Sequence, residues 1–138
     1  MNHPESQEQQ ALFDWAEYAR AKHPELDLLY HIPNGGKRDK LEAVRLKREG
    51  VKAGVPDLCL PVARGGYHGL YIELKAGKNT ASPLQRQWIA ALSREGYAAA
   101  VCTGWEQAAE VIGDYLGMKK GDKGRETDKG RQGAYAGI

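Results

Sequence analysis

Three residues of the chain carry side chains that could together perform hydrolytic chemistry: Asp57, Glu73 and Lys75. Glu73 and Lys75 lie two residues apart in "LYIELKA" (70–76), the clearest strand pattern in the sequence. Because alternate residues of a strand share a face, these two side chains are expected to point the same way. Asp57 begins a second strand pattern, "DLCLPV" (57–62). The short connection between the strands predicts an antiparallel hairpin, which brings Asp57 beside the other two if odd residues pair with odd.

The chemistry of two carboxylates and one ammonium group depends on a cation. Two carboxylates held close together repel each other unless a cation lies between them. A hard divalent ion such as Mg²⁺ prefers oxygen ligands and keeps several waters, so two carboxylates and a backbone carbonyl make a reasonable site. Such an ion can activate water and stabilise charge on a phosphoryl group, while Lys75 would orient the water and offset that charge. In the alternative interpretation, Asp57 caps a turn and Glu73 and Lys75 form an exposed ladder pair. Spacing alone favours neither interpretation.

The elements that must position these residues are those of an α/β domain. Helical periodicity and capping residues predict four helices, at 5–22, 38–49, 82–96 and 103–117. Strand patterns occupy four further segments, 26–32, 57–62, 70–76 and 97–102. Ser82 is the expected N-cap of the third helix, and Thr103 with Glu106 predicts a capping box at the fourth. The predicted order, α-β-α-β-β-α-β-α, indicates a small mixed sheet with helices on both sides.

Composition indicates one globular domain followed by a tail. The 138 residues suffice for a single core. No apolar run approaches the ~20 residues of a bilayer span, and no secretory signal pattern begins the chain. Cys59 and Cys102 form no CxxC pair, which favours two buried thiols in a reducing compartment and hence a cytoplasmic location. Beyond residue 117 the sequence is rich in Gly and charge, so 1–117 is the predicted domain and 118–138 a flexible basic tail.

A basic segment precedes Asp57. Residues 37–52 hold seven Lys or Arg against three acidic residues, and such a patch could follow a phosphate backbone. The alternative is a solvated helix face with i,i+3 and i,i+4 ion pairs, which is the commoner case for charge runs. The basic residues expected to contact DNA are Lys37, Arg38, Arg45 and Lys52.

Three segments together resemble a known nuclease family: "NGGKRDKLEAVRLKREGVKAGVPDL", "GLYIELKAG" and "SPLQRQW". They are similar to the virus-type replication-repair nuclease (VRR-NUC) family of the PD-(D/E)XK nuclease superfamily. The resemblance runs from about Gln7 to about Ile112, in the expected order and spacing. It implies a restriction-endonuclease-like fold and Mg²⁺- or Mn²⁺-dependent hydrolysis of DNA phosphodiester bonds.

The resemblance also implies a role for individual residues. Asp57 and Glu73 match the metal-binding carboxylates of the family, and the backbone carbonyl of Leu74 would complete the protein ligands. Lys75 matches the catalytic lysine. Gln85 matches a glutamine near the catalytic centre, although a polar residue in the first turn of a helix needs no such role.

Three further positions come from the same resemblance. The first helix of the superfamily often supplies another acid, for which Glu8 is the best match and Glu5 lies one turn earlier. Either acid could equally be one that favours the helix dipole. Asn34 falls in the asparagine-glycine turn of the family and could touch substrate, but as a turn residue it needs no such role. His31 is expected to be structural.

A stand-alone catalytic domain must recognise DNA by its own surface, by its tail or by oligomerising. The resemblance to small phage proteins implies a homodimer, which would present two active sites to a two-fold symmetric target such as a four-way (Holliday) junction. The leading hypothesis is therefore a metal-dependent, structure-selective DNA endonuclease of repair or recombination. The alternatives are a non-catalytic DNA-binding or assembly module, or a nuclease of the same fold acting on flaps, single strands or RNA.

Overall fold

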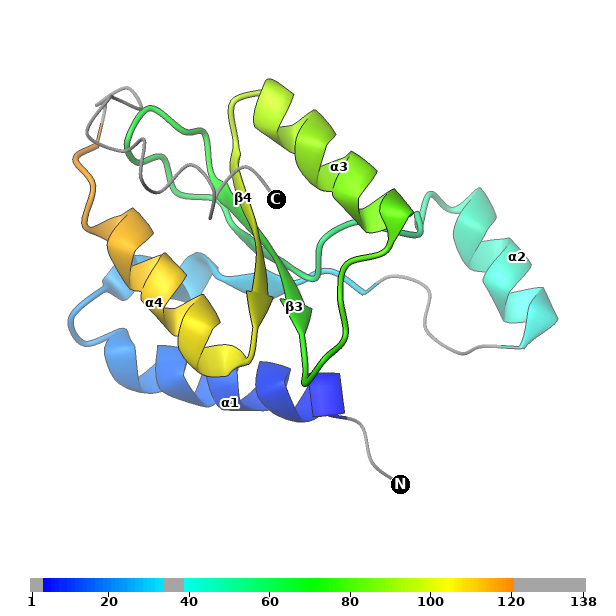
Figure 1. Cartoon of the computed structure of the whole chain (residues 1–138), viewed down its shortest axis with the longest axis horizontal. Helices are drawn as coiled ribbons and strands as arrows, with labels where there is room; N and C mark the ends of the chain where they lie inside the picture. The colour runs from blue at the N-terminus through cyan, green and yellow to red at the C-terminus, as the bar shows by residue number, and fades with distance from the viewer. Residues whose placement is uncertain (1–3, 34–38, 121–138) are drawn as a thin grey trace.

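A four-stranded mixed sheet forms the centre of the fold in the computed structural model, which describes residues 4–33 and 39–120 (Figure 1). The strands run in the spatial order β1-β2-β3-β4 and comprise β1 (Tyr30–His31), β2 (Leu58–Leu60), β3 (Leu70–Lys75) and β4 (Ala98–Thr103). The β1–β2 and β2–β3 pairs are antiparallel, and β3–β4 is parallel. The predicted hairpin is confirmed, since Leu58 pairs with Ile72, and the same register extended by one residue brings Asp57 opposite Glu73.

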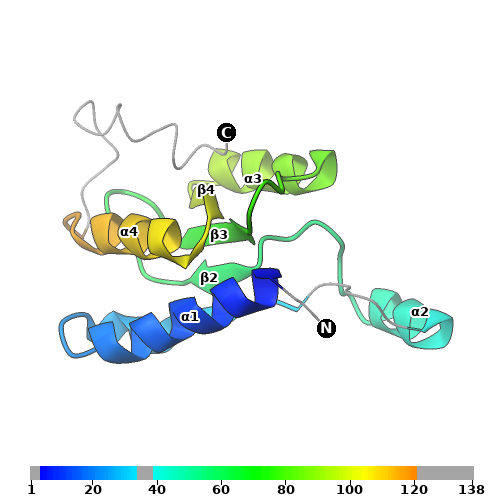
Figure 2. The ribbon, with the colours of Figure 1, turned by 60° about the horizontal axis from the view of Figure 1, so that its bottom comes forward.

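Helices cover both faces of this sheet (Figure 2). The long helix α1 (Pro4–Ala19) and the last helix α4 (Trp105–Leu116) pack on one face, and α3 (Pro83–Arg94) lies on the other. Helix α2 (Lys40–Arg48) has no buried residue and projects from the body of the fold in both views. The predicted element order and the mixed sheet with helices on both sides are confirmed. Within the described residues, no helix is long and apolar enough to cross a membrane.

The apolar core lies between the sheet and the layer formed by α1 and α4. Leu70, Ile72 and Leu74 of β3 are each 1% exposed and join this core. Helices α1 and α4 contribute the buried residues Leu12, Ala16, Ala108, Ile112 and Tyr115. Burial of each large aliphatic side chain stabilises the fold by about 1.5–3 kcal/mol. The even-numbered residues therefore anchor β3, which leaves its odd-numbered residues on the α3 side available for polar side chains.

One predicted strand is largely absent. The segment 26–32 was expected to be extended, but a 3₁₀ helix, η1 (Pro24–Leu28), precedes the two-residue strand β1. The amides of Leu26 and Leu29 donate to carbonyls three residues earlier. Leu26 and Leu29 therefore lie on one side of the segment, where both are buried. The other elements begin and end within three residues of their predicted limits.

The start of α4 also differs from the prediction. The expected capping box of Thr103 and Glu106 does not form, because the N-cap is Gly104 and makes no side-chain cap. Instead, Oε1 of Glu8 accepts a hydrogen bond of 2.8 Å from the amide of Trp105. A residue far away in the sequence thus replaces the local cap, and it ties α1 to the start of α4.

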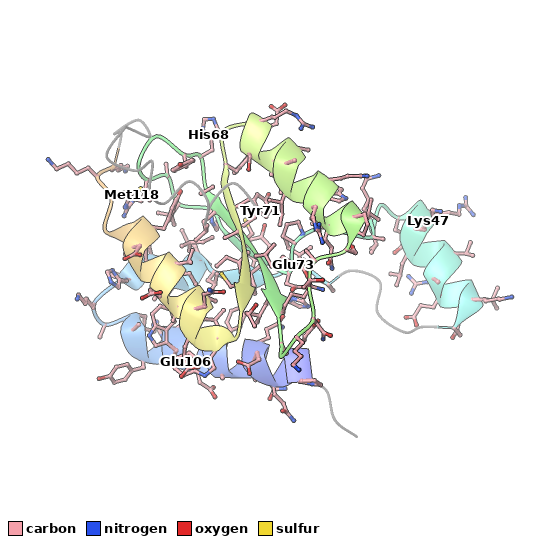
Figure 3. The ribbon with its side chains drawn as sticks, viewed as in Figure 1. Lys47, His68, Tyr71, Glu73, Glu106 and Met118 are labelled. Atoms are coloured by element: carbon pink, nitrogen blue, oxygen red, sulfur yellow. The ribbon has the colours of Figure 1, made fainter. Side chains whose placement is uncertain are left out.

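The packed chain continues two residues beyond the predicted domain boundary at 117. Met118 lies just past the end of α4 and packs against the core (Figure 3). The carbonyl of Lys119 accepts a hydrogen bond of 3.0 Å from the amide of Gly65. The remainder of the predicted tail, 121–138, lies outside the described residues.

Candidate active site

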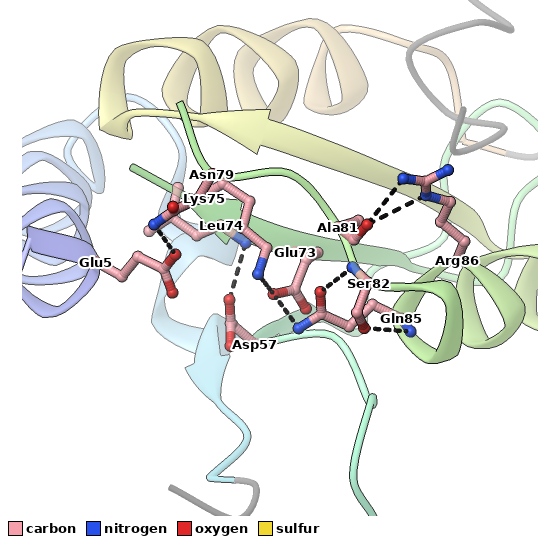
Figure 4. Close-up of polar contacts among 10 residues, drawn as sticks. All are labelled: Glu5, Asp57, Glu73, Leu74, Lys75, Asn79, Ala81, Ser82, Gln85 and Arg86. Carbon is pink, nitrogen blue, oxygen red and sulfur yellow. Dashed lines mark hydrogen bonds and ion pairs between the residues drawn. The ribbon is translucent and has the colours of Figure 1, made fainter. Parts of the chain in front are cut away.

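Asp57, Glu73 and Lys75 converge at the start of β2 and the end of β3 (Figure 4). Oδ2 of Asp57 accepts a hydrogen bond of 2.9 Å from the amide of Leu74. Oε2 of Glu73 lies 3.5 Å from Nζ of Lys75. Glu73 is 1% exposed and Lys75 is 8% exposed. This burial contradicts the alternative interpretation of the pair as an exposed ladder on the strand surface.

The two carboxylate oxygens of Glu73 have different environments. Oε2 accepts a hydrogen bond of 3.0 Å from Nε2 of Gln85 and also faces Lys75. Oε1 is buried and has no hydrogen-bond partner among the described residues. Burial raises the pKa of Glu73 to about 8; the charge of Asp57 acts in the same direction, and Lys75 acts against it. A buried acceptor without a partner is unfavourable, so Oε1 is the atom best suited to take a cation.

Asp57 is half-buried, and its carboxylate is also disfavoured. Burial raises its pKa, while the amide of Leu74, the carboxyl of Glu73 and the charge of His31 all oppose this shift. Glu5 adds a repulsive charge that raises the pKa further. The ammonium group of Lys75 thus lies beside two carboxyl groups, and the burial of both disfavours their charged forms.

An oxygen-preferring divalent cation fits these residues. Lys75 is one ammonium group beside two carboxyl groups, and one buried oxygen of Glu73 has no hydrogen-bond partner within the described residues. Among residues 4–33 and 39–120, no group of three or more Asp, Glu, His or Cys side chains is placed to hold a metal. Mg²⁺ commonly takes one or two carboxylates and keeps several waters. Asp57, Glu73 and the carbonyl of Leu74 are therefore a sufficient protein contribution for that ion.

Gln85 is fixed at both ends by the start of α3. Ser82 is the N-cap, as predicted, and its Oγ accepts a hydrogen bond of 3.2 Å from the amide of Gln85. Oε1 of Gln85 accepts a hydrogen bond of 2.8 Å from the amide of Ser82, which completes a capping box. The remaining Nε2 then points at Glu73. The capping box therefore determines which oxygen of Glu73 is occupied and which stays free.

Replacing Gln85 with alanine is expected to weaken metal binding as well as the fold, because Glu73 loses its orienting partner. Ser82→Ala is the matched control, since it removes the other half of the capping box but leaves the Gln85 amide in place. Both variants should lose about 1 kcal/mol of stability in urea unfolding. Only Gln85→Ala should bind Mg²⁺ or Mn²⁺ more weakly in calorimetric titrations. Equal metal affinities for the two variants would show that Gln85 acts only as a helix cap and has no role in metal binding.

Helix α1 brings Glu5, rather than Glu8, to the site. Glu8 is engaged at the amide of Trp105, whereas the charge of Glu5 acts on Asp57. Oε2 of Glu5 also accepts a hydrogen bond of 3.2 Å from Nδ2 of Asn79 (Figure 4). Asn79 was not among the predicted site residues, and its position in the loop after β3 is the only signal that could have found it.

His31 and its neighbour hold the backbone of Asp57. Nδ1 of His31 lies 3.0 Å from the carbonyl oxygen of Asp57. The amide of Ile32 donates to the same oxygen at 2.6 Å. Because a carbonyl only accepts, Nδ1 of His31 must carry the proton in this contact. The structure thus gives His31 the positioning contact of a structural residue, in agreement with the expectation.

The residues expected to contact DNA divide into three groups. One group lies outside the described residues and comprises Asn34, Lys37 and Arg38. Arg45 of α2 pairs with Glu42 at 3.7 Å and with the C-cap residue Glu49 at 3.1 Å, so at this position the ion-paired helix face is observed. Lys52 is exposed beside α2 and lines a groove.

Comparison with known proteins decides the family. The VRR-NUC domain model matches residues 3–106 of the 138. The chain belongs to the VRR-NUC family. A solved structure described as a VRR_NUC domain protein is 37% identical and has a TM-score of 0.74, over 90% of this chain and 96% of its own. A comparison with curated proteins gives no match. The predicted resemblance and fold are confirmed, and the family implies a function of nuclease type, with DNA as substrate.

Proposed function

We propose that this VRR-NUC protein is a divalent-metal-dependent endonuclease that hydrolyses phosphodiester bonds of DNA at Asp57, Glu73 and Lys75. The observation that carries the proposal is the buried Glu73, whose Oε2 lies 3.5 Å from the ammonium group of Lys75 and whose Oε1 has no hydrogen-bond partner among the described residues, with the carboxyl of Asp57 as its neighbour. Buried charges that are not fully compensated are disfavoured in folded proteins and cluster at functional sites. The same observation argues against a non-catalytic DNA-binding module, which needs no such arrangement.

The residues have separable roles in this proposal. Asp57, Glu73 and the carbonyl of Leu74 would hold Mg²⁺ or Mn²⁺, which when bound supplies Lewis-acid stabilisation of the phosphoryl charge. Lys75 has three donors, and its contact with Glu73 at 3.5 Å leaves the ammonium group able to orient the attacking water and to offset developing negative charge. Gln85 keeps the carboxylate of Glu73 in one orientation.

Replacing Lys75 with methionine is expected to lower the rate of DNA cleavage by roughly 10²–10³-fold, as for loss of one charge-stabilising group. Methionine keeps the apolar length of the buried stem and removes only the ammonium group. The measurement is single-turnover cleavage of a labelled four-way junction, a flap, a nicked duplex and a linear duplex, with Mg²⁺, Mn²⁺ or EDTA. Equal rates for Lys75→Met and the parent would show that the lysine has no catalytic role.

We further propose that branched DNA is the substrate and that a homodimer acts on it. One support is the projecting helix α2, which carries basic residues on an exposed surface. The other is the two-fold symmetry that a dimer shares with a four-way junction. The substrate panel above tests the first part, and sedimentation of the free protein tests the second. A preference for flaps, single strands or RNA over the junction would assign a different substrate to the same site.

A further inference from the structure

A groove of about 460 Å³ lies between α2 and the start of α3. Its surface is mostly apolar, and two lysines stand among the apolar residues. The residues that line it include Ala43, Leu46, Lys47, Val51, Lys52 and Leu84. Leu84 is 44% exposed, which places an apolar surface within reach of a ligand.

Both walls of this groove are formed by residues that lie close in the sequence to residues of the candidate active site. Gly54 has a φ of +90°, and a Cβ there would lie 2.6 Å from Cγ of Leu84, so the loop before β2 packs closely on the first turn of α3. Asp57 follows Gly54 by three residues on one wall. On the other wall, Leu84 directly precedes Gln85, whose amide holds the catalytic glutamate. A strand of DNA cut at the site would therefore pass the mouth of the groove.

The two lysines at the groove have no ion-pair partner among the described residues. Within the part of the chain that the structure describes, neither Lys47 nor Lys52 has a carboxylate at ion-pair distance, whereas Arg45 on the same helix is paired with Glu42 and Glu49. Figure 3 shows Lys47 on α2 and Glu73 on β3 beside the start of α3. An apolar floor flanked by two lysines that no described carboxylate pairs with suits a ligand that has a flat, weakly polar ring and anionic groups on either side, which describes a nucleotide.

We infer that this groove holds one unpaired nucleotide of the DNA strand being cut. The base lies against Leu46, Val51 and Leu84, and the flanking phosphates lie near Lys47 and Lys52. This inference rests on the proposed nuclease function and specifies its substrate class: DNA with an unpaired nucleotide next to the scissile bond. A base inside a continuous duplex must first leave its stack and its partner, so such DNA binds more weakly.

The test measures binding with the Glu73→Gln protein, so that no cleavage interferes. Fluorescence anisotropy gives the Kd for a duplex with one unpaired nucleotide at a nick, for the same DNA with that nucleotide made abasic, and for the continuous duplex. Removing the base is expected to raise the Kd about tenfold, comparable to the loss of one base contact. The base-containing and abasic substrates are compared on the same Glu73→Gln protein, so this comparison does not depend on a difference in folding between two proteins.

Three further variants locate the effect. Ala43→Trp fills the groove from an exposed position on α2 and should raise the Kd for the unpaired substrate about tenfold, with no further change for abasic DNA. Ala90→Trp, on the exposed side of α3, is the matched control and should bind like the parent. Lys47→Gln with Lys52→Gln should lower the slope of log K against log salt by about 2, since two phosphate contacts are lost.

Three results would overturn the inference: equal binding of the base-containing and abasic substrates, unchanged binding by Ala43→Trp, or competition by a polyglutamate peptide as effective as that by the oligonucleotide. Failure of the underlying nuclease proposal is distinguishable, because the parent protein would then give no metal-dependent product from any DNA. Failure of the groove inference alone leaves metal-dependent cleavage by the parent intact.

Discussion

Replacing Glu73 with glutamine is expected to lower kcat/KM for metal-dependent DNA cleavage by roughly 10³-fold. This is the upper end of the range of rate losses seen when one group that stabilises a transition state is removed. Glutamine has nearly the same shape but no negative charge for the cation. At pH 8 and without metal, the variant should also be more stable than the parent, because the parent buries a carboxylate whose pKa is raised to about 8.

Single-turnover cleavage and urea unfolding measure these two effects on one variant. Glu110→Gln, on the exposed side of α4, is the matched control and should change neither activity nor stability. The two effects of Glu73→Gln have opposite signs, lost activity with gained stability, which separates a functional charge from a structural one. Cleavage at the parental rate, or a marked loss of stability at pH 8, would remove Glu73 from the site.

The second large effect is a pH dependence that metal reverses. The folded protein holds a proton on Glu73 up to about pH 8, whereas the unfolded chain releases it near the ordinary value of 4.5. Unfolding in this window therefore releases a proton, so the free energy of unfolding of the metal-free protein should fall as pH rises from about 4.5 to about 8, by up to about 1.4 kcal/mol per pH unit. Above that window the slope from this group disappears.

Mg²⁺ should offset this loss, since it binds the deprotonated carboxylate, and its apparent affinity should rise with pH over the same window. Urea unfolding across the pH range, with and without Mg²⁺, measures the stability. Calorimetric titrations in two buffers of different ionisation enthalpy count the protons released on binding. The Glu73→Gln variant should show a flatter pH profile. A metal affinity independent of pH would mean that Glu73 is not a ligand.

The sequence was sufficient to predict the convergence of the three central residues, because alternation along two strands and a short connection are local properties. The burial of Glu73 and Lys75 was not predictable in the same way. Their burial depends on α3, which connects the parallel strands β3 and β4 and packs over the face of the sheet that carries Glu73 and Lys75. This packing is a long-range arrangement. Likewise, the resemblance placed Gln85 near the centre, but only the packed capping box shows which oxygen of Glu73 it occupies.

The two acids of the first helix show the same limit. Glu5 and Glu8 are one helical turn apart and therefore lie on similar faces of α1. Which of them meets Asp57 is decided by how α1 packs against α4, and this packing leaves Glu8 at the amide of Trp105. The groove beside α2 was also not predictable, since the close approach of Gly54 to Leu84 joins segments 30 residues apart in the sequence.

Cleavage of a labelled four-way junction by the parent protein and by Asp57→Asn tests most directly whether Asp57, Glu73 and Lys75 form a metal-dependent nuclease site. Asparagine keeps an acceptor for the amide of Leu74 but removes the charge. We expect product only from the parent and only when Mg²⁺ or Mn²⁺ is present. Product formed equally in EDTA, or equally by Asp57→Asn, would show that these residues are not a metal-dependent nuclease site.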